Sequence, residues 1–100
     1  MKIIEKLSDC IEEEIGDSEK YARKALEYKD DFPETAKLFY TLSLEELEHV
    51  NKLHNAVVAL IDNYRKSEGE PPKEMMAVYD YLHKKQIDRV SEVKILQTMF

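Results

Sequence analysis

Two short stretches rich in proline, glycine and acidic residues divide the chain and limit what it can fold into. They are Asp30-Asp31-Phe32-Pro33 and Ser67-Glu68-Gly69-Glu70-Pro71-Pro72. Pro33 suits the first turn of a helix and the aspartates suit its cap, whereas glycine and two prolines end one helix and open another. The spacing predicts three helices, over about 3–30, 33–66 and 72–99. The short first connection predicts an antiparallel hairpin.

The composition favours a single all-α domain over residues 1–100. Hydrophobic residues make up 43% of the chain, which is enough for a core, and β-branched residues do not alternate as they do in strands. The net charge of −6 and the lack of a basic stripe argue against a nucleic-acid partner. No stretch resembles a membrane span or a signal peptide, so we expect a cytoplasmic protein. The single cysteine, Cys10, excludes an internal disulfide and is expected to be a buried thiol.

Helical phase separates acidic residues of the first helix that face the core from those that face water. The apolar stripe of this helix comprises Ile4, Leu7, Ile11, Ile15, Ala22 and Ala25. Glu14 lies roughly 60° from the centre of the stripe, while Glu13 lies nearly opposite. The phase therefore predicts that Glu14 is half or fully buried and that Glu13 is solvated.

The second helix carries an acidic run, Glu45 to His49, that the same argument divides. Its apolar stripe comprises Phe39, Leu42, Val50, Leu53, Val57, Leu60, Ile61 and Tyr64. Glu46 falls within roughly 10° of the centre of this stripe and His49 about 50° to one side, so both are expected to face the core. Glu48, about 150° away, faces water, and Glu45 lies at the boundary, about 90° away. His54, also about 90° away, is expected at the surface.

The third helix contains a second acid-x-x-His pair, Asp80 and His83. Its apolar side comprises Met75, Val78, Leu82, Val93, Leu96 and Phe100. Asp80 lies roughly 150° from the centre of this side and His83 about 90°, which argues against an internal metal site. Glu92, about 90° away, is a weak flanking candidate.

Three inward residues of ligand type are expected at one level of the hairpin. A carboxylate within an apolar stripe is costly unless it is paired or coordinated, and Glu46 and His49, three residues apart, can share a metal ion. Glu14 lies 18 residues before Phe32 and Glu46 lies 14 after it, a mismatch of only about 6 Å in axial rise. The alternative is an ion pair of Glu46 with His49 without metal. Tyr21 is expected to be a core aromatic, with a hydrogen bond to a ligand as the alternative.

These residues resemble the ferritin-like superfamily, and the rubrerythrin group in particular. The resemblance covers about residues 11–53 and rests on order and spacing. It comprises Glu14, Tyr21 and Ala25 in the first helix, and Ala36, Phe39, Glu46 and His49 in the second. It implies that Glu14, Glu46 and His49 are catalytic and iron ligands, with Glu46 bridging two metals and the other two terminal.

A complete ferritin-like bundle takes a second set of ligands from another helix pair, which this chain lacks. The resemblance therefore implies a homodimer, or a higher homo-oligomer, in which two hairpins form one four-helix bundle around a di-iron centre, similar to the encapsulated ferritin group. There is no Cys-x-x-Cys for a rubredoxin-like iron centre. The C-terminal residues are typical of a helix rather than of a shell-loading peptide, which argues against encapsulation. The sequence does not identify a shell or an electron-donor partner.

The expected function is oxidation of Fe(II), as a ferroxidase in iron storage or detoxification. Two alternatives stay open. One is a rubrerythrin-like peroxide reductase that takes electrons from an external donor. The other is a metal-free helical interaction module.

Overall fold

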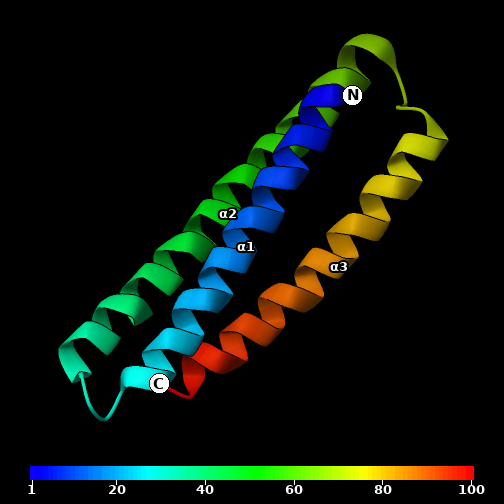
Figure 1. Ribbon diagram of the computed structural model, residues 1–100. Coiled ribbons are helices and arrows are strands. Elements are labelled where there is room, and N and C mark those ends of the chain that lie inside the picture. Colours follow the sequence, from blue (N-terminus) through cyan, green and yellow to red (C-terminus); the bar gives the residue numbers. More distant parts are fainter.

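The chain folds into three long helices that run side by side as a rod (Figure 1). The computed structural model describes all of residues 1–100, and the rod measures 56 × 18 × 18 Å. Helix α1 spans Lys2–Tyr28, α2 spans Pro33–Glu68 and α3 spans Lys73–Thr98. The three predicted helices and the α1–α2 hairpin are confirmed, and every bound agrees to within two residues. None of the helices carries an apolar stretch long enough to cross a membrane.

Proline and glycine end the helices as their backbone chemistry predicts. Pro33 is in the first turn of α2, where its missing N–H has no partner to lose. Gly69 closes α2 with φ of 88°, a conformation that favours glycine, and its N–H donates to the carbonyl of Arg65 at 3.2 Å. The predicted aspartate cap is wrong, because Phe32 holds the cap position and no side chain bonds there.

The hydrophobic core lies mainly between α1 and α2. Its buried members are Ile4, Ile11, Ile15, Leu47, Val50, Val57, Ile61 and, from α3, Val93. The predicted stripe of α1 is confirmed as a face that meets its partner helix. The predicted stripe of α2 is confirmed only in part, because Val50, Val57 and Ile61 are buried while its other members are half-buried. Cys10 is exposed rather than buried, since it projects from the side of α1 away from this contact.

Helix α3 packs mainly on α1, and much of the contact is polar. Its buried residues are Gln86, Val93 and Gln97, and Arg89 Nη1 donates to Glu12 Oε2 at 2.6 Å. Val78, predicted on the apolar side, is 60% exposed. The prediction for Val78 is wrong because two glutamines share the inner face of α3, which hydropathy alone does not reveal.

Candidate metal centre

Two serines fix the register in which α1 and α2 pack. Ser18 Oγ donates to the Ser43 carbonyl at 2.7 Å, and Ser43 Oγ donates to the Ser18 carbonyl at 2.7 Å. Neither serine is exposed to solvent, so sliding either helix would leave buried hydroxyls unpaired. Ser18 follows Glu14 by four residues and Ser43 precedes Glu46 by three. In an antiparallel pair, this sets the two glutamates at one level.

The structure brings the three predicted ligands together at this level. Donor atoms of Glu14, Glu46 and His49 all lie within 4.8 Å of one another. His49 Nδ1 is 3.4 Å from Glu14 Oε2 and 3.8 Å from Glu46 Oε2. The side chain of Glu46 is 18% exposed, that of Glu14 is 28% exposed and that of His49 is 48% exposed. His49 therefore lies at the edge of the hairpin rather than in its core, contrary to the prediction.

The donor set fits a transition-metal ion. An ion bound about 2.0–2.2 Å from oxygen and nitrogen donors holds neighbouring donors about 3–4 Å apart. The two distances from His49 fall in this range, and all three donor atoms lie within 4.8 Å of one another. Two carboxylates and one imidazole suit iron, manganese or zinc. Three protein donors also leave coordination positions open, as a catalytic site requires.

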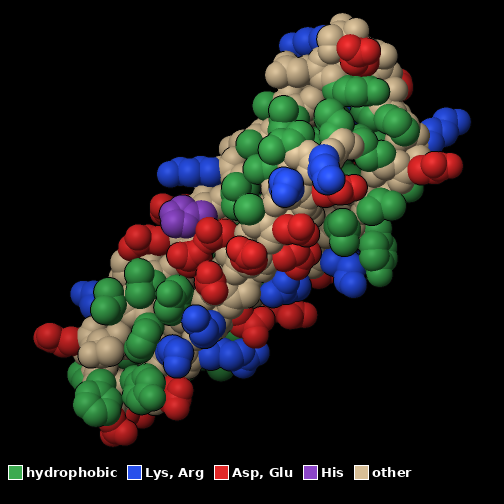
Figure 2. Space-filling view, turned by 45° about the horizontal axis from the view of Figure 1, so that its top comes forward, with side chains coloured by type: hydrophobic (Ala, Val, Ile, Leu, Met, Phe, Trp, Pro, Cys, Tyr) green, Lys and Arg blue, Asp and Glu red, His purple; other side chains and the backbone are tan.

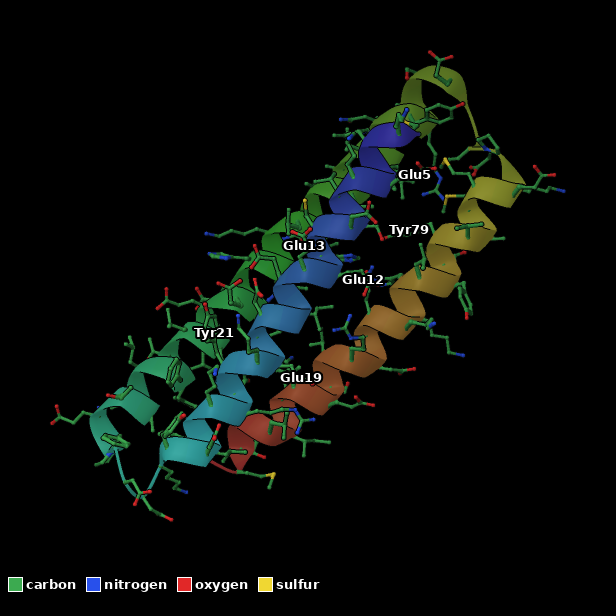
Figure 3. All side chains as sticks on the ribbon, viewed as in Figure 1. Glu5, Glu12, Glu13, Glu19, Tyr21 and Tyr79 are labelled. Carbon is green, nitrogen blue, oxygen red and sulfur yellow. The ribbon has the colours of Figure 1, made fainter.

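The three ligands open onto the flank of the hairpin that α3 does not cover. Glu12 contacts α3, since it accepts hydrogen bonds from Arg89 and from Gln86. Glu14, two residues further on, lies roughly 200° around the helix from Glu12. Figure 3 shows Glu12 turned toward α3 and Tyr21 on the opposite side of α1. The candidate centre is thus separate from the surface that holds α3.

Apolar side chains continue this open flank in both directions from the ligands. They recur every seven residues along two stripes, Leu7, Glu14, Tyr21 and Tyr28 on α1 and Phe39, Glu46, Leu53 and Leu60 on α2. Every member of both stripes is only half-buried. A seven-residue repeat of partly exposed apolar residues is typical of a helix face that packs against further helices. The two glutamates interrupt these stripes at one level.

Aromatic rings close the end of the open flank near the first loop. Tyr21 stacks on Phe39 with ring centroids 6.1 Å apart. Tyr28 also stacks on Phe39, with ring centroids 6.4 Å apart. Tyr21 therefore packs against another aromatic ring, as predicted, but it is half-buried on the open flank rather than in the core. No hydrogen bond joins its hydroxyl to a ligand.

Acidic side chains surround the candidate centre on the surface. Glu13 and Glu48 are exposed, as predicted, and Glu45 at the predicted boundary is exposed as well. On the face drawn in Figure 2, acidic side chains gather beside a histidine near the middle of the rod, with hydrophobic side chains toward both ends. In a chain of net charge −6, such a surface raises the local concentration of cations.

The remaining candidate residues lie elsewhere. His83 stacks on His54 with centroids 4.5 Å apart and an interplanar angle of 5°, and both rings are half-buried. His54 is thus covered by α3 rather than lying free on the surface. Burial, and next the neighbouring His83, lower the pKa of His54. Asp80 and Glu92 are exposed on α3 and do not join the three ligands.

Comparison with protein-family models, with curated proteins and with solved structures gives no match to this chain.

Proposed function

We propose that two copies of this chain join along the open flank and oxidise Fe(II) at a di-iron centre between them. The observation that carries the proposal is a half-site: two carboxylates and one imidazole lie together on a flank that the rest of the chain leaves open. A two-fold axis along this flank supplies four carboxylates and two imidazoles. That set matches the ligands of ferritin-like di-iron proteins.

The position of each ligand suits a distinct role toward the iron substrate. We assign the bridging role to Glu46, because its side chain is the least exposed of the three. Glu14 and His49 lie further out and are placed as terminal ligands. Hard oxygen donors favour the ferric over the ferrous state, which makes electron transfer from bound Fe(II) to dioxygen more favourable.

Anaerobic loading with Fe(II), followed by metal analysis and native mass measurement, tests the proposal. Wild type is expected to bind about one iron per chain and to gain native mass on loading, because iron joins chains through the open flank. It is then expected to consume dioxygen when air is admitted. Glu46→Ala is expected to lose iron and iron-dependent dimerisation, whereas Glu48→Ala, an exposed neighbour, is expected to keep both. Wild type that binds no iron under these conditions would refute the proposal. Faster reoxidation by hydrogen peroxide than by dioxygen would identify the peroxide reductase instead.

The contact between His49 and Glu14 favours one competing function. At 3.4 Å the two side chains form an ion pair when the imidazole is protonated, and Glu46 lies close enough to join it. In a metal-free interaction module, this ion pair would form part of a polar surface that contacts a partner helix. The same loading experiment separates the two, because iron does not change the native mass of such a module.

A further inference from the structure

The outward side of α3 carries large hydrophobic side chains that no other part of the chain covers. Tyr81 and Ile95 are each 62% exposed and Met99 is 59% exposed. They belong to a row of residues spaced three or four apart along one side of α3, which we call the outer seam. The outer seam comprises Ala77, Tyr81, Lys84, Asp88, Glu92, Ile95 and Met99, all exposed. It lies on the side of the helix opposite Gln86 and Val93, which are buried toward α1.

We propose that the outer seam pairs with the outer seam of a second copy, antiparallel and centred on Asp88. In this register Tyr81 lies opposite Ile95 of the second copy, and Ala77 lies opposite Met99. Each large apolar side chain near one end of the seam therefore meets an apolar side chain from the other end. The two-fold axis repeats every contact, as in an isologous interface.

The charges in the middle of the outer seam match in the same register. Lys84 lies opposite Glu92 of the second copy, and symmetry forms this pair twice. The two Asp88 carboxylates meet near the axis, with Lys84 one helical turn away on each helix to offset their repulsion. Facing acids and bases at these positions select orientation and register, as they do in coiled coils.

The charge of the outer seam favours a copy of this chain over an acidic or a basic partner. The outer seam carries one lysine, Lys84, and two acids, Asp88 and Glu92, so it is nearly neutral on a chain whose net charge is −6. The seam also lies away from the flank that carries Glu14, so the two surfaces do not compete for one partner. This pairing does not depend on the proposed iron centre and is expected without metal.

Zero-length coupling of carboxylates to amines tests the register directly. Lys84 and Glu92 of one chain are eight residues apart, about 12 Å along the helix, which is too far for a direct amide bond. In an equal mixture of ¹⁴N- and ¹⁵N-labelled chains treated with a carbodiimide in the presence of a chelator, we expect a Lys84–Glu92 amide that joins both labels. Amides of Lys84 with Asp88, four residues apart, verify that coupling occurs. Finding only amides of that kind would overturn the proposal.

Charge reversal gives a second, independent readout. Lys84→Glu or Glu92→Lys alone is expected to weaken metal-free association about tenfold, because symmetry repeats the repulsion. Combining both substitutions is expected to restore it, since the pair is then reversed. Failure of the combination to restore association would contradict the pairing.

An apolar variant and its control complete the test. Ile95→Asp is expected to abolish metal-free association, and because Ile95 is 62% exposed the fold should stay intact. Ile87→Asp, the same substitution at a 51% exposed residue roughly 100° around α3 from the seam, is expected to leave association unchanged. Equal loss in both variants would reject the outer seam as the interface. Glu46→Ala is expected to associate like wild type without metal, which separates this test from that of the iron centre.

Discussion

A single hydroxyl, that of Ser43, connects all three helices. Its Oγ donates to the Ser18 carbonyl of α1 and accepts from Gln97 Nε2 of α3 at 2.9 Å. Ser43→Ala leaves both partners buried without it, so we expect the free energy of unfolding to fall by about 1–3 kcal/mol. Ser67→Ala, at an exposed serine of the same helix, is expected to change it by less than about 0.5 kcal/mol. Urea unfolding measures both, and equal losses would contradict the role of Ser43.

His54 makes stability depend on pH. Its pKa is lowered in the folded chain by burial and by His83, so the unfolded chain takes up the proton first as the pH falls. The stability that the neutral ring contributes is complete above the usual histidine pKa of about 6.5 and is lost as the pH falls below it.

Replacing His54 should therefore make the free energy of unfolding less dependent on pH below about 6.5. We expect His54→Asn to lose part of the decrease in unfolding free energy between about pH 6.5 and 5 in metal-free protein. Urea titrations at a series of pH values measure the slope. A slope as steep as that of wild type would show that other groups cause it.

At the scale of the helices, sequence predicts the ends and the inner faces well where backbone chemistry or strong periodicity decides. Pro33 and Gly69 mark real boundaries, and the stripe through Ile11 and Ile15 is the buried face of α1. Phase also places Glu14 and Glu46 on one side. It fails for His49, because the angle from a helix's own stripe does not reveal whether another element covers that flank. It also does not predict the role of Ser18 and Ser43. Their hydroxyls bond across the two helices only because the two backbones approach closely.

Helix α3 is expected to open before the α1–α2 hairpin does. Val93 is its only fully buried hydrophobic residue, and much of its remaining contact consists of the polar bonds of Gln86, Arg89 and Gln97. Elements with few buried apolar contacts unfold locally at lower free energy. Hydrogen exchange followed by mass spectrometry should show faster exchange in α3 than in the paired parts of α1 and α2. Val93→Ala should widen this difference, and uniform protection of all three helices would argue against it.

At the scale of the whole molecule, the rod exposes two different surfaces on opposite sides of its section. One is the open flank with its acidic centre between apolar stripes, and the other is the outer seam of α3. The first is half-buried in the single chain and includes two carboxylates whose close approach is unfavourable without a cation. Iron is therefore expected to control assembly through the open flank, whereas the outer seam acts without it.

This difference predicts how the melting temperature responds to concentration. If iron is shared between two chains, unfolding releases both chains and the metal, so mass action raises the melting temperature with iron and with protein concentration together. Calorimetry on an anaerobic dilution series, with Fe(II) or with a chelator, measures the iron-dependent part. Glu14→Gln should lose that part, and Glu13→Gln, at an exposed neighbour, should keep it. A melting temperature that rises with iron but shows the same concentration dependence with chelator would place the iron within one chain, because only a shared centre couples metal binding to association.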